Sequence, residues 1–342
     1  MSDLDIIRRA PFNAETPDRA LRLSHTPSRQ VYVRSNFDVP VLHDAHAISI
    51  GGLVDAPFDI SVAELSLLPQ CTIDVTMECA GNDRMSMQPL PAGEPWQHGA
   101  LSTVTWTGVP LRRVLERARV GTLALEVAFQ GADTGMRDDA ESLVTFERSL
   151  PIAAAMDEDT LLALGMNGHP LTPEHGAPVR LVVPKWYGMA SVKWLRRIDV
   201  RATPFDGYFQ RQRYVYDAPG GITPVMRMRV KSIITAPTAG ASCLADTVVE
   251  GWAWSGDGAI TRVELAVDGG DQWREVELGS PSSPHAWTPW RCVVSLTPGS
   301  RCALRSRATD ASGATQPPVV EWNRLGYGNN AVRPIVVDVL QG

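Results

Sequence analysis

The sequence predicts an α+β protein of two domains, a mixed domain of helices and strands over residues 1–221 and an all-β sandwich over residues 222–342. A chain of 342 residues exceeds what one hydrophobic core usually supports. The first part contains both strand-like and helix-like patterns. From Thr247 onward, short alternating segments recur at regular spacing without helical segments between them, which is typical of a sandwich of about 100 residues.

The first 45 residues carry many Pro, Asn and Arg residues with little periodicity, so we expect an arm that wraps over a domain. Within this arm, residues 31–37 are strand-like and deliver Arg34 to one end of the strand. The other strands expected in the first domain cover residues 47–54, 72–78, 123–129, 161–164 and 179–183. Between the last two, Asn167-Gly168 is a turn signal, although the whole connection is too long for a two-residue hairpin.

Two helices are expected among these strands. Ser61 and Glu64 have the spacing of a capping box, which opens a short helix. Pro110 fits the first turn of a second helix. The apolar stripe of that helix consists of Leu111, Val114, Leu115 and Ala118. Residues 85–99 between the two helices carry Pro and Gly and are expected to form a loop.

The expected strands of the sandwich are short and separated by turn clusters. They cover residues 248–254, 260–267, 273–278, 290–296, 302–308 and 335–340. Residues 268–271, with the sequence Asp-Gly-Gly-Asp, predict a tight connection between two of them.

Composition excludes several classes of protein. The net charge of -6 argues against general nucleic-acid binding, and no apolar run reaches the roughly 20 residues that span a bilayer. Five cysteines without a close CxxC pair exclude the usual zinc-finger, thioredoxin and covalent haem spacings. The acidic start is not a secretory signal, so we expect a cytoplasmic protein, or a periplasmic one if an export signal was removed.

The stretch 72–84 is the first candidate for a reactive site. Its first half alternates apolar and polar residues like a strand, and its second half, Ala80-Gly81-Asn82, favours a turn. Cys79 therefore lies at the mouth of a strand. A thiol in this place can be reactive or a buried structural residue, and the pattern leaves both readings open.

A cluster of basic residues stands out against the acidic net charge. Between Arg180 and Arg213 there are eight basic residues and two acidic ones: Arg180, Lys185, Lys193, Arg196, Arg197, Arg201, Arg211 and Arg213, with Asp199 and Asp206. Together with His175, Arg34 and Arg84 they could form a pocket for an anion. A solvated basic face is the alternative.

Two further patterns point to specific chemistry. Gly188, Ser191 and Lys193 could cradle a phosphate, although they lack the spacing of a P-loop or of GxGxxG. Cys79 and His175 could form a hydrolytic pair, oriented by Glu78, Asp74 or Asp133. A sandwich-type binding protein without catalysis is a third possibility.

Cys79-Ala80-Gly81-Asn82-Asp83-Arg84 resembles the CAGNRR signature of the sulfite oxidase family of molybdenum enzymes. The resemblance continues in the same order along nearly the whole chain. It covers residues 11–15, 33–36, 95–96, 99–102, 106–111, 166–168, 175–180, 191–194, 251–256 and 267–270.

This resemblance implies a mixed molybdopterin-binding domain followed by an immunoglobulin-like dimerisation domain. Cys79 would be the thiolate that ligates molybdenum, since a soft sulfur suits a transition metal that changes redox state. Arg34 and Arg84 would bind an oxyanion substrate, and Tyr214 would be the active-site tyrosine. The residues expected around the pterin and its phosphate are Tyr32, Val33, Arg34, Ser35, Asn36, Asp133, His175, Arg180, Ser191, Val192 and Lys193.

The activity implied by the resemblance is oxidation of sulfite to sulfate by oxygen-atom transfer, with electrons passed to a separate acceptor such as a cytochrome or oxygen. The cofactor would perform the redox step while the protein binds and orients. We expect molybdenum with molybdopterin, no haem, and a homodimer. A related molybdenum enzyme acting on another small oxo-substrate is the alternative within the family.

Three positions depart from the family pattern. Asp83 replaces the first arginine of the signature, which would lower the positive charge near the pocket. Asn36 replaces a histidine and changes one hydrogen-bond partner. Ala259 stands where animal and plant sulfite oxidases place an arginine that helps bind sulfite. Fewer cations facing an anion would weaken its binding. Sulfite is the leading expectation for the substrate, and another small oxo-substrate stays open.

Overall fold

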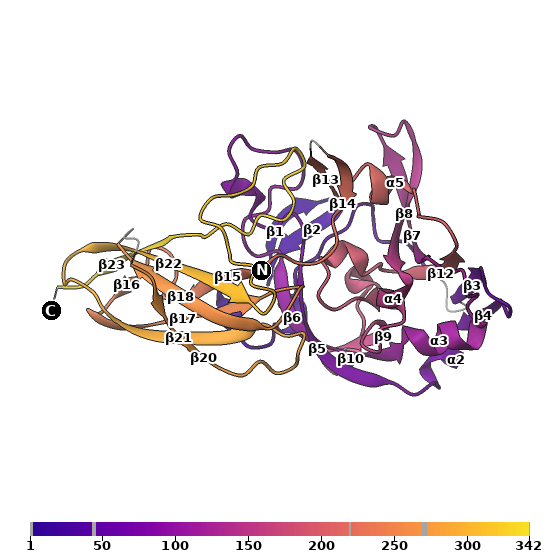
Figure 1. The fold of residues 1–342 in the computed structure, drawn as a ribbon, viewed down its shortest axis with the longest axis horizontal. Coiled ribbons are helices and arrows are strands. Elements are labelled where there is room, and N and C mark those ends of the chain that lie inside the picture. Colours follow the sequence, from indigo (N-terminus) through magenta and orange to yellow (C-terminus); the bar gives the residue numbers. More distant parts are fainter. Residues whose placement is uncertain (1–2, 43–45, 219, 269–271, 342) are drawn as a thin grey trace.

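The computed structural model describes residues 3–42, 46–218, 220–268 and 272–341, and in these residues it has two lobes (Figure 1). The first lobe is a mixed α+β domain with short helices, and the second is a β-sandwich that ends at the C-terminus. The fold class predicted from the sequence is confirmed.

The first sheet of the first lobe carries the strand that leads to Cys79. Its strand order is β10-β9-β6-β5, and β11 also pairs with β9. The strands are β5 Cys71–Glu78, β6 Leu101–Pro110, β9 Leu161–Met166, β10 His169–Pro170 and β11 Arg180–Val182. All its pairs are antiparallel, with Glu78 opposite Leu101. Strand β6 was not predicted, because its first four residues are all buried and show no alternation.

The second sheet of the first lobe has the order β4-β3-β12-β7-β8. Its strands are β3 Ala47–Gly52, β4 Phe58–Ser61, β7 Glu126–Arg137, β8 Ser142–Pro151 and β12 Leu195–Arg201. Only the β3–β12 pair is parallel among the described pairs of this sheet. Strand β7 continues beyond residue 129, where we expected it to end, and its register shifts between Gln130 and Thr134. Asp133 lies in this irregular part.

The helices are short. They are α1 Asp18–Leu21, α2 Val62–Ser66, α3 Leu111–Ala118, α4 Ile152–Ala155 and α5 Tyr208–Arg211, with 3-10 turns η1 Ser28–Gln30, η2 Arg84–Ser86, η3 Pro173–His175 and η4 Gly188–Ala190. The capping box of Ser61 and Glu64 is present at the start of α2. All four predicted stripe residues of α3 are buried, and Pro110 directly precedes this helix.

The segment 31–37 is not a strand. Val33 forms one bridge to Ala14, while the amide of Tyr32 donates to the side-chain oxygens of Thr16 and Ser102. Side chains that take the backbone hydrogen bonds compete with a sheet ladder. The arm contains instead the hairpin of β1 Asp5–Arg9 and β2 Phe12–Glu15.

Asn167-Gly168 does form a two-residue hairpin, but between β9 and the short β10. Both residues have positive φ, 52° and 76°, as a tight hairpin turn requires. The strand at 179–183 is found as β11, which pairs with β9. The predicted turn at Asn167-Gly168 is confirmed. The sequence prediction did not include the short strand β10 that follows this turn.

The sandwich packs two sheets around its own core. One has the order β15-β17-β21-β20 and the other β16-β23-β22-β18-β19. The strands are β15 Lys231–Ala236, β16 Ser242–Cys243, β17 Asp246–Trp254, β18 Ile260–Val267, β19 Arg274–Glu275, β20 Glu277–Leu278, β21 Thr288–Ser295, β22 Arg301–Asp310 and β23 Ile335–Val339. The six predicted segments are found, with 273–278 divided between β19 and β20. The connection predicted at 268–271 falls mainly on 269–271, outside the described residues.

The two lobes share one buried core. The hydrophobic cluster of the first lobe includes Ile233, Trp254, Trp287, Leu325 and Tyr327 from the second. A hairpin of β13 Val215–Ala218 and β14 Gly221–Pro224 contains residue 222, so the domain boundary at that residue stays a prediction.

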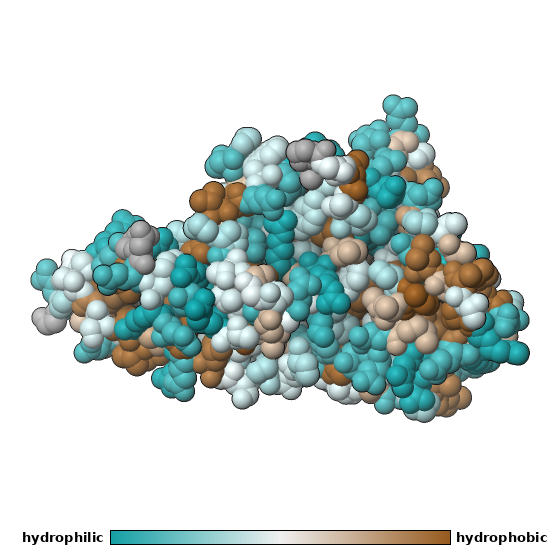
Figure 2. All heavy atoms as spheres, viewed as in Figure 1, coloured by the Kyte–Doolittle hydropathy of each residue, from teal (hydrophilic) through white to brown (hydrophobic). Residues whose placement is uncertain are grey.

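The surface is mixed in character. Figure 2 shows hydrophilic residues over much of one face, with separate hydrophobic areas on both lobes. Among the helices of the described residues, we find none with the length and apolar character that a bilayer crossing requires.

Candidate active site

Cys79 follows the last residue of β5 and is buried. Its amide donates to the carbonyl of Ala100 at 2.8 Å, and its own carbonyl accepts from Asn82. The side chain of Asn82 ties the turn to Glu78 and to the amide of Ala100. Burial raises the pKa of the Cys79 thiol, and the charge of Arg34 acts in the opposite direction. The turn therefore fixes a buried sulfur at the end of a strand.

Cys79 opens into a first cavity of about 760 Å³, a volume that includes solvent at its mouth. It is lined by Val31, Tyr32, Val33, Arg34, Ser35, Asn36, Met77, Cys79, Ser102, Val104, Trp106, Asp133, Phe146, Glu174, His175, Arg180, Gly188, Met189, Ser191, Lys193, Trp194 and Tyr214. The structure thus brings together every residue predicted around the pterin except Val192. We call this space the inner cavity.

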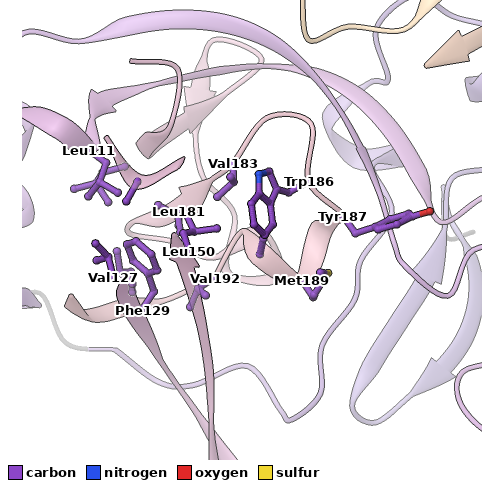
Figure 3. Close-up of a cluster of buried hydrophobic side chains, with 14 of the residues drawn as sticks. Leu111, Val127, Phe129, Leu150, Leu181, Val183, Trp186, Tyr187, Met189 and Val192 are labelled. Carbon is purple, nitrogen blue, oxygen red and sulfur yellow. The ribbon is translucent and has the colours of Figure 1, made fainter. Parts of the chain in front are cut away.

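Val192 does not line the inner cavity. Its side chain is fully buried in the hydrophobic core, in the cluster that also contains Phe129 and Leu181 (Figure 3). Its amide donates to Ala190 and its carbonyl accepts from Leu181. Both backbone groups are therefore used, and we assign Val192 a packing role.

Arg180 joins the segments that carry the other polar residues of the inner cavity. Its guanidinium donates to the carbonyls of His175 and Ser191, both at 3.0 Å, and lies 5.0 Å from the ring centre of Trp106. Burial lowers the pKa of Arg180 to about 10, so it stays charged at neutral pH. One cation thus holds the 3-10 turn η3 beside the chain that follows η4.

Lys193 and Asp133 are two titratable groups at the same wall of the inner cavity. The Lys193 ammonium donates to Ser35 Oγ and to the carbonyl of Glu174, both at 2.8 Å. Burial, reinforced by the charge of Arg180, lowers the pKa of Lys193 well below its usual range. Burial also raises the pKa of Asp133 to about 6, although Lys193 opposes this shift.

His175 is a neutral residue in this wall. Its Nε2 lies 3.4 Å from the carbonyl of Val31 and its Nδ1 lies 2.9 Å from the hydroxyl of Thr172. Burial, together with the charges of Lys193 and Arg180, lowers its pKa to about 3. With Nε2 donating and Nδ1 accepting, no nitrogen remains to take a proton from Cys79. The geometry therefore argues against the Cys79–His175 hydrolase considered from the sequence.

Two buried polar atoms of the inner cavity have no hydrogen-bond partner in the described residues. They are Trp106 Nε1 and Asp133 Oδ1. Gly188 leaves further space, since a Cβ there would lie 2.6 Å from the hydroxyl of Tyr32. Buried polar groups normally find partners, so this wall is built for a polar group that the chain does not itself supply.

Cys79 also lines a second cavity, of about 740 Å³ including open solvent. It shares Arg34, Asn36, Cys79 and Tyr214 with the inner cavity. Its lining consists of Arg8, Arg34, Asn36, Cys79, Arg84, Ala92, Gly93, Glu94, Trp96, Arg137, Arg213, Tyr214, Leu325 and Tyr327. We call this space the outer cavity.

Asn36 links two of the predicted catalytic residues. Its Oδ1 accepts from Arg34 at 2.7 Å, and its Nδ2 donates to the hydroxyl of Tyr214 at 3.2 Å. Arg34 also donates to the carbonyl of Ser35 and to Asn13 Oδ1. Tyr214 has a φ of 43°, a conformation that is uncommon for a residue with a side chain. The departure at Asn36 thus connects Arg34 to Tyr214.

Arg84 is buried and held by backbone carbonyls. It donates to Glu94 at 2.6 Å and twice to Leu325, at 3.2 and 3.0 Å. Gly81 and Gly93 make room for the guanidinium, since a Cβ at either position would lie within 3 Å of it. In the described residues neither Arg84 nor Arg34 has an ion pair with a carboxylate. Their positive charges remain available to an anion.

Asp83 does not lie in either cavity, which corrects the expectation that it lowers the charge of the pocket. Its carboxylate accepts from Lys231 of the second lobe at 2.6 Å. The same ammonium lies 3.1 Å from Glu78. Asp83 therefore balances a buried lysine from the second lobe, a partner 148 residues away that the sequence pattern did not indicate.

Ala259 is also outside both cavities. It lines a third cavity with Lys185, Arg227 and Gly256. The lack of an arginine at position 259 therefore does not affect anion binding near Cys79.

The sequence reasoning missed Tyr327, which the second lobe contributes to the outer cavity. The signal that could have found it is its position between two glycines, Gly326 and Gly328.

Comparisons with known proteins decide the family. The model of the oxidoreductase molybdopterin binding domain matches residues 36–209, and that of the Mo-co oxidoreductase dimerisation domain matches residues 223–339. The mitochondrial sulfite oxidase of Rattus norvegicus is 33% identical over 98% of this chain and 66% of its own length. The chain belongs to the sulfite oxidase family of molybdopterin-dependent oxidoreductases. It spans about two thirds of the rat protein.

Other members of the family have different names. Nitrate reductase [NADH] 1 of Arabidopsis thaliana is 32% identical over 96% of this chain and 40% of its own length. The crystal structure of the sulfane dehydrogenase SoxCD from Paracoccus pantotrophus matches with a TM-score of 0.82 and 29% identity, over 98% of this chain and 88% of that one.

The inner cavity fits the molybdopterin cofactor of this family. Cys79 offers a soft sulfur ligand at one end. Arg180 offers a cation and Lys193 a basic group for a phosphate at its wall, and Trp106 Nε1 and Asp133 Oδ1 offer hydrogen bonds for a pterin. In the described residues no cluster of three or more His, Cys, Asp or Glu side chains could hold a metal ion.

Proposed function

We propose that this protein oxidises sulfite to sulfate and passes the electrons to a separate acceptor. The observation that carries the proposal is the pair of guanidiniums of Arg34 and Arg84 at the outer cavity beside Cys79, without carboxylate partners in the described residues. Planar guanidiniums suit a small oxyanion. The sulfite oxidases among the relatives support the same substrate.

The bound cofactor would supply a two-electron redox centre at Cys79. The chain's own residues bind and orient the substrate. Arg34 and Arg84, which both line the outer cavity, attract the anion into it. Asn36 Nδ2 donates to the Tyr214 oxygen at 3.2 Å, while the Tyr214 hydroxyl has only a long contact of 3.5 Å to Asn36 Oδ1, which a substrate oxygen can replace. Asn36 also holds Arg34 next to that hydroxyl.

A second candidate is oxidation of another small sulfur or oxo compound. It is favoured by the match to SoxCD, which is described as a sulfane dehydrogenase and covers 98% of the chain. The outer cavity, at about 740 Å³ with open solvent, also has room for an anion larger than sulfite.

Activity assays with an artificial acceptor separate these candidates. The purified holoprotein is mixed with ferricyanide and, in turn, sulfite or thiosulfate, which contains a sulfane sulfur. Nitrate is tested with a reduced dye. We expect ferricyanide reduction with sulfite and about one molybdenum per chain, as a resident cofactor requires. Turnover with thiosulfate and none with sulfite would move the assignment to the second candidate.

We further propose a homodimer formed through the second domain, since that domain matches the family's dimerisation model. Sedimentation equilibrium of the purified protein tests this proposal. The identity of the electron acceptor, the lack of haem and the cytoplasmic or periplasmic location stay predictions.

A further inference from the structure

Tyr327 is a residue of the second lobe that reaches the outer cavity. Its side chain is buried and lines this cavity together with Arg34, Arg84 and Tyr214. Its ring stacks on that of Tyr214, with centroids 5.2 Å apart and planes inclined by 24°. The Arg84 guanidinium lies 5.2 Å from the centre of the same ring. Tyr327 therefore touches two residues of the proposed substrate site.

The backbone around Tyr327 is held in place on both sides. The amide and carbonyl of Tyr327 both bond to the side chain of Asn323, at 2.9 and 2.8 Å. Gly326 and Gly328 have positive φ, and the amide of Gly328 donates to the carbonyl of Ala80 at 2.7 Å. Ala80 is the neighbour of Cys79, so the segment of Tyr327 is attached directly to the turn after β5.

Gly326 is required for this arrangement. A Cβ at this position would lie 2.8 Å from Arg84 Nε, and its φ of 62° disfavours any residue with a side chain. The segment thus combines a close approach to Arg84 with an aromatic residue over the guanidinium. A packing role by itself would not require a tyrosine with a hydroxyl.

The hydrogen bonds found for Tyr327 within the described part of the chain are those of its backbone, and its hydroxyl is not one of the fully buried polar atoms that lack a partner. The hydroxyl is therefore accessible from the outer cavity, which Tyr327 lines. Burial raises its pKa to about 12, while the charges of Arg84, Arg213 and Arg34 act in the opposite direction. The hydroxyl is therefore protonated at neutral pH and lies within the field of three cations. Such a group can donate to an anion that those cations attract.

We propose that Tyr327 is a substrate-binding residue, whose hydroxyl donates a hydrogen bond to an oxygen of the anion bound by Arg34 and Arg84. The second lobe then contributes directly to specificity for an oxyanion. This inference rests on the proposed function only in requiring an anionic substrate in the outer cavity.

The test is the variant Tyr327→Phe in the full-length holoprotein. It removes the hydroxyl and keeps the ring on Tyr214 and Arg84. The matched control is Tyr216→Phe, which removes another buried hydroxyl close to Gly328 but outside both cavities. For Tyr327→Phe we expect the KM for sulfite to rise about tenfold, as for a lost hydrogen bond to a charged group, with a much smaller change in kcat. The control should keep the wild-type KM.

Sulfate binding supplies a readout that does not depend on turnover. Titration calorimetry of each holoprotein with sulfate should show an affinity about tenfold weaker for Tyr327→Phe and unchanged for Tyr216→Phe. Sulfate affinity and KM within twofold of wild type in Tyr327→Phe would overturn the inference. If the wild type binds sulfate without oxidising sulfite and Tyr327→Phe binds it more weakly, the inference holds and the substrate assignment fails.

A second variant covers the case in which Tyr327→Phe loses stability. Asn323→Ala leaves the hydroxyl of Tyr327 present but releases its backbone. A merely structural role predicts that folded Asn323→Ala loses sulfate affinity at least as much as folded Tyr327→Phe when both are measured at low temperature. A binding role predicts weaker sulfate affinity for folded Tyr327→Phe under those conditions.

Discussion

Cys79 combines a fixed position with a protonated resting state when no metal is bound. The turn of residues 79–82 holds its backbone, and burial raises the pKa of its thiol. A metal ion would be needed to stabilise the thiolate in this environment. The same residue therefore makes a poor nucleophile and a suitable metal ligand.

The variant Cys79→Ser should keep the fold and lose sulfite oxidation. Serine is nearly the same size as cysteine, but its hard oxygen is a poor replacement for a thiolate on a redox-active metal. Circular dichroism melting and a sulfite assay measure the two effects. Sulfite turnover near the wild-type rate would contradict the ligand assignment.

Glu15 gives a prediction of pH dependence. It is buried in β2, and burial raises its pKa from 4.5 to about 7, although the amide of Gly99 donates to it. Because the pKa of Glu15 is higher in the folded than in the unfolded state, protonation of its carboxyl stabilises the folded protein. This stabilisation is fully present below pH 4.5 and is lost as the pH rises through 7.

The variant Glu15→Gln removes this titration. It should melt at a higher temperature than wild type at pH 8, by an amount that corresponds to about 2–3 kcal/mol, and at nearly the same temperature at pH 5. Differential scanning fluorimetry at the two pH values measures the difference. Equal melting temperatures at pH 8 would show that the carboxylate is solvated.

At the scale of elements, the turn after β5 is also held by partners from the second lobe, in β15 and in the segment 325–329. Lys231 of β15 is 2% exposed and pairs with Glu78 and Asp83. Trp254 Nε1 of β17 donates to Glu78 Oε2 at 3.0 Å. The sandwich thus positions the strand end that carries Cys79, in addition to its expected role in dimerisation.

The variant Lys231→Met should lower the free energy of unfolding by about 3–5 kcal/mol, because it removes the ammonium from two buried carboxylates and leaves Asp83 with only the more distant Arg333, at 3.8 Å. The matched control is Arg29→Met, which breaks an exposed pair with Asp3 and should cost less than about 1 kcal/mol. Urea unfolding of the three proteins measures the difference. If Lys231→Met lowers the free energy of unfolding no more than the control does, water enters the network of Lys231, Glu78 and Asp83.

At the scale of the whole molecule, one hydrophobic cluster joins the two lobes, in addition to the sandwich's own core. The indole nitrogens of Trp252 and Trp287 donate to the carbonyls of Leu21 and Ser24 in the first lobe, and their rings stack 4.8 Å apart. Arg84 of the first lobe is held by Leu325 of the second. Unfolding either lobe alone would expose these groups to water.

We therefore expect one cooperative unfolding transition for the full chain. Scanning calorimetry should give a calorimetric enthalpy that equals the van't Hoff enthalpy per cooperative unit. Two separate transitions, with the sandwich melting independently, would show that the shared core contributes little to stability.

Local patterns gave good predictions where a residue's role depends on its neighbours in the chain. The buried stripe of α3, the capping box of Ser61 and Glu64, and the strand before Cys79 all follow from short-range periodicity. The segment 31–37 was wrong as a strand, because Thr16 and Ser102 take the amide of Tyr32. Side-chain competition of this kind is not visible in the periodicity of a segment.

The sequence by itself determined the two-domain α+β fold, the family, and the set of polar residues that meet around Cys79. These depend on motifs whose residues lie close together along the chain. The tertiary structure decided which charged groups face the outer cavity. Asp83 is neutralised by Lys231, Arg84 is fixed by Leu325 from 241 positions away, and Tyr327 enters the outer cavity. Electrostatic interactions act through space, so only the folded chain shows which charged groups are neighbours.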